Sequence, residues 1–365
     1  MFKDVYKDRR VLVTGHTGFK GSWLSTWLLD LGAKVAGYSL DIPTQPSHFE
    51  SLGITKKIEH FTGDVLDKKA LQQVFKQFRP EVVFHLAAQS LVRESYKNPA
   101  LTLETNAIGT LNLLECLREN PSSVTVAVLV TSDKCYENVE WLWGYRENDR
   151  LGGNDLYSAS KACAEIISNA YMKSFFKEGG PCIATARAGN VIGGGDWAND
   201  RVIPDCVRAW SKGEPVVIRN PSSTRPWQHV LEPLSGYLAL GQELFEGNLT
   251  AKNQSFNFGP QIQVNQSGAD LITEIARLWP DAKSELQQQT NSEKPESILL
   301  KLNCDKALQI LQWKAILNFE ETASMTRKWY QSFYNQGPSS TSKITSGQIQ
   351  EYFEKAAQLN LPWAH

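Results

Sequence analysis

The sequence predicts an α/β fold built on a doubly wound parallel sheet, with a smaller, interleaved C-terminal domain. Three observations lead to this prediction. From Arg10 onward, short β-branched runs alternate with longer helical patterns. Two of these runs, Val-Val-Phe-His-Leu and Val-Ala-Val-Leu-Val, are almost wholly apolar, as in strands buried on both faces of a sheet. After about Arg187 the alternation weakens, and Gly, Pro and Trp become common.

The expected strands and helices alternate along the first half of the chain. Strands are expected at 11–14, 34–38, 58–62, 82–86, 124–130 and 182–186. Helices are expected at 21–31, 68–78, 100–119 and 158–177. Right-handed crossovers would join the strands into the parallel sheet.

Charge and composition exclude several classes of partner. The formal net charge is −1, so no overall field would draw the protein to nucleic acid or an anionic membrane. No apolar stretch approaches the roughly 18 residues of a membrane span, and the six histidines are too dispersed for a metal site. The six cysteines form no CxxC pair and no apolar leader is visible, which favours reduced thiols in the cytoplasm.

A glycine-rich turn lies between the first expected strand and helix. It reads Gly15-His-Thr17-Gly18-Phe19-Lys-Gly21. Glycines there permit a tight turn and a close approach of backbone amides to a pyrophosphate at a helix N-terminus. Asp41 follows the second strand, where a carboxylate can accept hydrogen bonds from the adenosine ribose and repel a 2′-phosphate, so NAD is favoured over NADP. An ordinary strand-to-helix turn, and a turn-forming aspartate before Ile42-Pro43, are the alternatives.

A second pattern, Tyr157-Ser-Ala-Ser-Lys161, predicts an acid-base pair. Positions four apart share a helix face, so the ammonium can stabilise a phenolate and lower the phenol pKa from about 10 towards working pH. Ser132 ends an apolar strand at the edge where active sites of such sheets collect, and Asp133 and Lys134 place an acid and a potential base beside it. A surface helix pair and a solvated loop pair are the alternatives.

These motifs resemble the extended short-chain dehydrogenase/reductases, in particular the nucleotide-sugar 4,6-dehydratase branch. The Gly-x-x-Gly-x-x-Gly spacing is the version typical of that family, and the resemblance extends from Gly15 to about Gly259. Relatives for dTDP-glucose and GDP-mannose usually carry Asp-Glu after the hydroxyl residue, whereas this chain has Asp133-Lys134, as the CDP-glucose enzymes do. Further family-like segments are Thr105–Thr110, Arg187–Gly193, Arg201–Pro204, Arg225–Trp227 and Asn257–Gly259.

The resemblance implies roles for particular residues. Besides the glycine turn, Tyr157 and Lys161, it implies NAD contacts at Asp64, Val65, Leu86, Ala87, Ala88 and Thr105. It implies nucleotide-sugar contacts at Gln89, Ser90, Asn190, Arg201 and Arg225, with a surface ion pair as the alternative for each arginine. Relatives often carry tyrosine where this chain has His229, which either meets the base or packs behind Arg225.

The chemistry that the resemblance implies begins when Tyr157 deprotonates the sugar C4 hydroxyl while hydride passes to NAD⁺. Lys134 then removes the C5 proton, Asp133 protonates the departing C6 hydroxyl, and the hydride returns to C6. The product would be CDP-4-keto-6-deoxyglucose, a precursor of deoxysugars in bacterial surface polysaccharides such as lipopolysaccharide. A nucleotide-sugar 4-epimerase, a dehydratase for another nucleotide sugar and a catalytically silent NAD-binding protein are the alternatives.

The expected organisation has three parts. Residues 1–187 would form the NAD-binding Rossmann-type domain, and 188–336 a mainly nucleotide-sugar-binding domain interleaved with it. Residues 337–365 would form a linker, flexible at 337–346, and a final helix at 348–358. By resemblance, the helices at 100–119 and 158–177 would pair with their counterparts in a homodimer.

Overall fold

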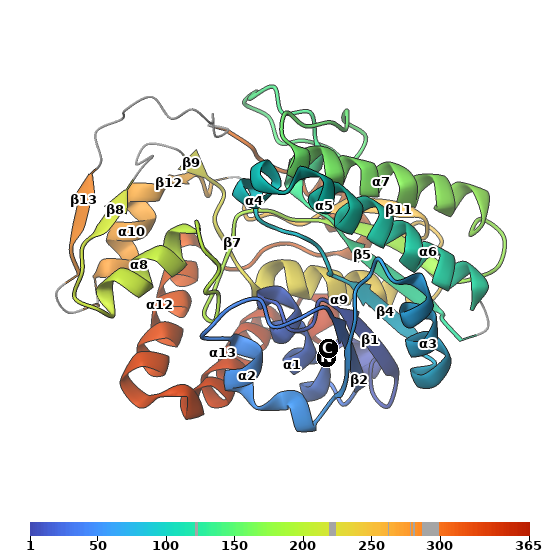
Figure 1. Cartoon of the computed structure of the whole chain (residues 1–365), viewed down its shortest axis with the longest axis horizontal. Helices are drawn as coiled ribbons and strands as arrows, with labels where there is room; N and C mark the ends of the chain where they lie inside the picture. Colours follow the sequence, from blue (N-terminus) through green and yellow to red (C-terminus); the bar gives the residue numbers. More distant parts are fainter. Residues whose placement is uncertain (121–122, 219–223, 262, 278, 280–281, 287–298) are drawn as a thin grey trace.

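A wholly parallel, seven-stranded sheet forms the centre of the molecule (Figure 1). The computed structural model describes all residues except 121–122, 219–223, 262, 278, 280–281 and 287–298. The strand order is β11-β6-β5-β4-β1-β2-β3, which confirms the doubly wound prediction. The strands are β1 (Arg10–Thr14), β2 (Lys34–Ser39), β3 (Glu59–Thr62), β4 (Val82–His85), β5 (Val126–Val130), β6 (Cys182–Arg187) and β11 (Gln254–Asn257).

The seventh strand, β11, was not predicted. Its residues are Gln-Ser-Phe-Asn, which include no β-branched side chain and show no apolar run. It pairs with β6 at one edge of the sheet, and there only Phe256 and Asn257 are buried. An edge strand needs little apolar sequence of its own, so this strand left no recognisable pattern.

Helices cover both faces of the sheet, each over its own hydrophobic core. On one face lie α1 (Phe19–Asp30) and α9 (Leu231–Phe245), and on the other α3 (Lys68–Phe78), α6 (Gly109–Glu119) and α7 (Leu156–Ser174) (Figure 1). Successive strand residues point to opposite cores: Val11 and Val82 pack with the first group of helices, Leu12 and Val83 with the second. Because both faces are covered, the central strands β4 and β5 are buried and almost wholly apolar, whereas the edge strands β3 and β11 are more polar.

The predicted helix at 100–119 is interrupted by a π-helical turn. The chain runs from α5 (Pro99–Leu103) through this turn (Glu104–Ile108) into α6. The turn directs the buried Asn106 side chain towards Gln89 and α7, where its amide donates to the Gln89 carbonyl at 2.9 Å and to Ser160 Oγ at 2.8 Å. Turns of this kind often occur at functional sites, because they re-aim a side chain within a helix.

A smaller lobe extends from the carboxyl edge of the sheet, at the left of Figure 1. It contains three two-stranded pairs, β7 with β10, β9 with β12 and β8 with β13. Its elements are β7 (Val191–Ile192), α8 (Val202–Trp210), β8 (Val216–Ile218), β9 (Thr224–Arg225), β10 (Gln228–His229), β12 (Gln266–Ser267), α10 (Gly268–Ala276) and β13 (Ser284–Leu286). Between β10 and β12 the chain returns to the main sheet through α9 and β11.

The expected flexible joint at 337–346 is wrong. After α11 (Asp305–Leu311) and α12 (Phe319–Gln336), a 3-10 turn (Pro338–Ser340) leads directly into α13 (Thr341–Gln358). The polar sequence resembled a linker, but Thr341 and Thr345 are buried, and Thr345 Oγ1 accepts a hydrogen bond from the Trp329 indole at 2.9 Å. Two further short α-helices in the described residues are α2 (His48–Leu52) and α4 (Val92–Lys97).

The two chain ends lie together: the amide of Lys3 donates to the carbonyl of His365 at 3.2 Å (Figure 1). None of the helices in the described part of the chain combines the length and the apolarity that a bilayer-spanning segment needs.

Candidate active site

One large cleft dominates the carboxyl edge of the sheet. Its volume is about 1580 Å³, and it runs from the turn between β1 and α1 to α8 and β9 of the smaller lobe. β1 lies between β2 and β4 in the sheet, so the strand order reverses at β1: β2 and β3 extend to one side of it, and β4, β5 and β6 to the other. The cleft begins at this reversal point. Ligands of doubly wound sheets bind at this point.

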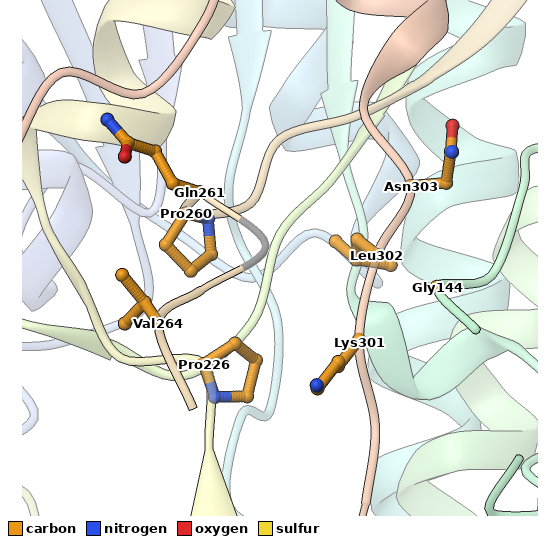
Figure 2. A pocket seen from close by; sticks show the side chains of 8 residues that line it. All are labelled: Gly144, Pro226, Pro260, Gln261, Val264, Lys301, Leu302 and Asn303. Atoms are coloured by element: carbon orange, nitrogen blue, oxygen red, sulfur yellow. The ribbon is translucent and has the colours of Figure 1, made fainter. Parts of the chain in front are cut away.

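A second pocket is far smaller. It lies between the segments around Pro226, Pro260 and Lys301 and has a volume of about 40 Å³ (Figure 2). Small-molecule sites in proteins usually enclose roughly 300–1,000 Å³. Of these two pockets, only the large cleft can therefore hold a cofactor together with a substrate.

The glycine turn is built for close contact with a ligand. Gly15 has φ +74°, and a Cβ atom there would stand 2.7 Å from the amide nitrogen of Ala87. A Cβ atom at Gly21 would stand 2.1 Å from the carbonyl oxygen of Gly15. Neither position has room for a side chain, so the turn is tight, and its residues line the cleft at the start of α1. The turn therefore fits the pyrophosphate of a dinucleotide.

The structure brings all the residues predicted to bind the cofactor to this cleft. The side chain of Asp41 is exposed, while its carbonyl accepts a hydrogen bond from Thr17 Oγ1 at 2.6 Å. The carboxylate of Asp64 accepts from the Leu66 amide at 2.9 Å, which fixes the loop after β3. The cleft-lining set comprises Gly15, Thr17, Gly18, Phe19, Gly21, Asp41, Asp64, Val65, Leu86, Ala87, Ala88, Thr105, Tyr157 and Lys161.

Tyr157 and Lys161 lie in the first two turns of α7. Asp155 caps this helix by accepting from the Ser158 amide at 2.9 Å, so the phenol stands at the helix start and the amine one turn further on. Both side chains are buried and line the cleft. Their arrangement on one face agrees with the four-residue spacing.

The pKa expected for Tyr157 does not hold in the protein without ligands. Burial raises the pKa of Tyr157 to about 12, although the hydrogen bond between Tyr157 and Ser132 acts in the opposite direction. Burial also lowers the pKa of Lys161 to about 8. Desolvation disfavours both charged forms, which spacing along a helix does not reveal.

Ser132, Asp133 and Lys134 follow β5 and form the start of a short 3-10 turn. The Ser132 hydroxyl donates to Asp133 Oδ1 at 3.0 Å, and the Asn190 side chain donates to Asp133 Oδ2 at 3.2 Å. The amide of Lys134 donates to Ser132 Oγ at 3.2 Å, and the Lys134 side chain lines the cleft. Ser132 and Asp133 are buried, whereas Lys134 is only partly buried.

A buried ion pair supports this group from behind. Glu165 on α7 and Arg187 at the end of β6 are joined at 2.7 Å, with both side chains almost fully buried. The Thr131 hydroxyl also donates to Glu165, which ties the end of β5 to α7. Burial opposes ionisation of Glu165, but Arg187 and the hydrogen bonds still hold its pKa below its ordinary value. Sequence analysis did not predict this pair.

The residues predicted to contact the substrate line the same cleft. Gln89 is fixed by Asn106, which accepts from its amide at 2.9 Å. Arg201 forms an ion pair with Asp196 at 2.8 Å and donates to Ser90 Oγ at 3.3 Å, so it bridges two walls of the cleft. The full predicted set, Gln89, Ser90, Asn190, Arg201 and Arg225, lies along the cleft beyond the catalytic group.

For His229, contact with the base and packing behind Arg225 were the alternatives, and the contact that the structure shows is with Trp23. The His229 ring is fully buried and meets the Trp23 ring edge-on, with 5.9 Å between the ring centres. Among the described residues that line the cleft, His229 does not occur. Sequence analysis missed Lys20, Asp196 and Trp227, which do line the cleft. For Lys20 a signal existed, because a lysine interrupts an otherwise small and apolar end of the glycine turn.

The sheet, the glycine turn and the serine, tyrosine and lysine in one cleft define an extended short-chain dehydrogenase/reductase. The family model of GDP-mannose 4,6 dehydratase matches residues 12–326, and the chain belongs to this family. It is 46% identical over 338 residues to the CDP-glucose 4,6-dehydratase of Salmonella typhimurium, covering 91% of this chain and 93% of the relative.

Solved structures of epimerases share the fold. An epimerase from Methanothermobacter thermautotrophicus superposes with a TM-score of 0.78 and 26% identity, covering 92% of this chain and 96% of that one. The UDP-glucose 4-epimerase of Thermus thermophilus, solved with NAD, has a TM-score of 0.74 and 26% identity, covering 88% and 99%.

Proposed function

We propose that this protein is a CDP-glucose 4,6-dehydratase, which converts CDP-D-glucose to CDP-4-keto-6-deoxy-D-glucose and water with NAD as its cofactor. The observation that carries the proposal is the hydrogen-bonded pair of Ser132 and Asp133 beside Tyr157 in the cleft of the glycine turn. The 46% identity to the Salmonella enzyme supports the choice of substrate. Such a product would feed the synthesis of deoxysugars in surface polysaccharides such as lipopolysaccharide.

In the first step, Tyr157 removes the proton of the C4 hydroxyl, which Ser132 orients. NAD held by the glycine turn and the other cleft residues predicted to bind it would supply the hydride chemistry, taking the hydride from C4 and giving it back to C6. The Lys161 ammonium would favour the phenolate, and Arg201 acts in the same direction, against the burial that raises the Tyr157 pKa.

In the second step, water leaves across C5 and C6. The 4-ketone acidifies the C5 hydrogen, and Lys134 takes this proton while the C5–H electron pair forms the new double bond. The electron pair of the C6–O bond leaves with the oxygen, which takes a proton from Asp133. Lys134 afterwards returns a proton to C5 as the hydride reaches C6, so that only water is lost from the sugar.

The contacts of Ser132 explain how Asp133 acquires its proton. The Asp133 carboxylate accepts hydrogen bonds from the Ser132 hydroxyl and from the Asn190 side chain. Ser132 bonds to Tyr157 on one side and donates to Asp133 on the other. The proton taken from the C4 hydroxyl can therefore pass from Tyr157 through Ser132 to Asp133, which then holds it when the C6–O bond breaks.

Contacts with the nucleotide diphosphate come from the smaller lobe. We assign the phosphates to Arg201 and Arg225, whose planar guanidinium groups can donate paired hydrogen bonds, and to Asn190. Gln89 and Ser90, after β4, would hold the hexose. The proposed division into domains at 1–187, 188–336 and 337–365 follows these roles, with α9 and β11 of the second segment packed on the first.

A homodimer through α5, α6 and α7 is also proposed. These helices pack side by side on one outer face (Figure 1). Large apolar side chains remain exposed on them, including Leu101 at 47% and Ile166 at 56%. Burying such side chains against a second copy would be favourable. The six cysteines are all free thiols, which supports a cytoplasmic location.

The experiment is incubation with CDP-, dTDP-, GDP- and UDP-linked glucose, followed by the ultraviolet absorption of the 4-ketone in alkali. Efficient conversion of CDP-glucose alone is expected. A C4 epimer without ketone would instead identify an epimerase, but that activity has no use for the acid and base at Asp133 and Lys134. Absence of any reaction with bound NAD would indicate a silent binding protein.

A further inference from the structure

Lys20 is a cation in the cleft to which the reaction described above gives no role. It lies in the first turn of α1, directly before Gly21. Its amine is 3.4 Å from the Tyr237 hydroxyl on α9 and 5.9 Å from the centre of that ring. Within the described part of the chain, its amine forms no ion pair with a carboxylate of the protein.

The charged groups that act on Lys20 are residues proposed for catalysis or for substrate binding. Its amine interacts electrostatically with Arg201, Asp133 and Lys161. Burial lowers the pKa of Lys20 to about 7, Arg201 and Lys161 act in the same direction, and Asp133 opposes them. Near neutral pH the amine is therefore protonated in part of the molecules. Among the described residues, Asp133, the proposed acid of the elimination step, is the one carboxyl group that acts on it electrostatically.

This placement does not suit the adenosine end of a dinucleotide. The carboxylates proposed for that end, Asp41 and Asp64, are not among the charges that act on Lys20. Lys20 instead lines the same cleft as Asp133 and interacts electrostatically with it, and Asp133 is the group that donates a proton to the substrate in the proposed mechanism. Negative charge develops there when a carbon–oxygen bond breaks, and a positioned cation lowers the cost of that charge.

We propose that Lys20 is a further catalytic residue of the elimination step, whose ammonium donates a hydrogen bond to the C6 oxygen while the C6–O bond breaks. This rests on the proposed dehydratase function. The proton that makes water still comes from Asp133, the electron pair of the C6–O bond leaves with oxygen, and Lys20 keeps its own proton. Tyr237, buried on α9, accepts a hydrogen bond from the amine and so holds it in place.

The test separates oxidation at C4 from elimination in single turnovers with CDP-glucose. Lys20→Met removes the charge at similar length, Lys20→Arg keeps it, and Lys76→Met on the exposed face of α3 is the matched control. Absorbance at 340 nm follows the reduced cofactor, alkaline ultraviolet absorption follows the ketone product, and calorimetry measures the affinities for NAD and CDP-glucose.

In Lys20→Met, elimination is expected to slow about 10- to 100-fold, as for loss of one charge-assisted hydrogen bond. C4 oxidation and both affinities should stay close to wild type, so reduced cofactor accumulates. Lys20→Arg should recover most of the rate. The wild-type elimination rate should fall as pH rises through about 7, and this fall should move to higher pH in Lys20→Arg.

Provided that the wild-type protein converts CDP-glucose, two results would overturn the proposal. One is elimination by Lys20→Met at the rate of Lys76→Met. The other is an equal slowing of oxidation and elimination with weakened NAD binding, which would assign Lys20 to cofactor binding. A wild-type protein that does not convert CDP-glucose would contradict the proposed function as well, and that result is distinguishable because it appears before any substitution is made.

Discussion

The Ser132 hydroxyl donates to Asp133 Oδ1 across 3.0 Å and also bonds to the Tyr157 phenol. One hydroxyl thus joins the proposed base of the oxidation step to the proposed acid of the elimination step. In the proposed mechanism the base gains a proton during oxidation and the acid gives one during elimination, so this link would order the two steps in time. Elimination becomes possible only after the C4 proton has moved.

Asp133→Asn should separate the two steps. Asparagine can still accept the hydrogen bond of Ser132, but it has no proton to give, so elimination should slow about 10²- to 10⁴-fold while C4 oxidation persists. The measurement is rapid-quench analysis with CDP-glucose and with its 6-deoxy-6-fluoro analogue. Fluoride leaves without a proton, so the analogue should react normally in the variant. Equal slowing of both substrates would exclude Asp133 as the acid.

Lys134→Ala should abolish proton exchange at C5. With C5-deuterated CDP-glucose, the wild-type product should contain solvent hydrogen at C5, because the lysine amine exchanges its proton before returning it. The variant should oxidise C4 and then stop, with its deuterium retained, as mass spectrometry of the quenched sugar would reveal. Undiminished washout of deuterium in the variant would remove Lys134 from the role of base.

Glu165→Gln should destabilise the protein far more than loss of an exposed ion pair. The substitution leaves Arg187 charged and buried without its partner, which typically costs about 3–5 kcal/mol in the free energy of unfolding. Glu137→Gln, which breaks the exposed pair with Arg150, is the control and should cost less than about 1 kcal/mol. Urea unfolding measures both. Similar losses in the two variants would contradict the structural role of the buried pair.

Glu232 should make stability depend on pH in an unusual direction. It is buried on α9, accepts the amides of Ile316 and Leu317 at 2.9 and 2.7 Å, and accepts the Tyr352 hydroxyl at 2.7 Å. Burial raises its pKa from 4.5 to about 7, so the folded state holds the proton more tightly than the unfolded state. Its contribution is therefore complete below about pH 4.5 and is lost as pH rises through about 7.

Glu232→Gln is the matched test of this pH dependence. Glutamine can accept the same two amides and donate to Tyr352, but it does not titrate. Relative to the variant, the wild type should lose about 3 kcal/mol of unfolding free energy between pH 4.5 and 7.5. Urea titrations at several pH values measure this difference. Parallel pH curves for the two proteins would show that Glu232 does not titrate as described.

Local patterns predicted the sheet and much of the candidate site. The glycine turn, the capped helix with Tyr157 and Lys161, and the polar residues after apolar strands each leave a short-range signal, and their convergence follows from the parallel order of the strands. The edge strand β11, the buried start of α13 and the Glu165–Arg187 pair depend on contacts between distant segments. No periodicity within one segment records such contacts.

The pKa of Tyr157 shows the same limit in chemical terms. Its helical spacing to Lys161 predicted a lowered value, whereas burial raises it to about 12 in the protein alone. Desolvation depends on every atom that excludes water from the phenol, and these atoms come from several elements. Lys20 left a signal in the glycine turn, but its electrostatic interaction with Asp133 arises only in the fold.

Internal return of the hydride is the central claim of this account, and CDP-glucose deuterated at C4 tests it most directly. The product, analysed by mass spectrometry and proton NMR, should carry the deuterium on the C6 methyl group, because the hydride taken from C4 returns to the same sugar. Deuterium retained at C4 of an epimerised sugar, or lost to the cofactor pool with no label at C6, would contradict the dehydratase mechanism.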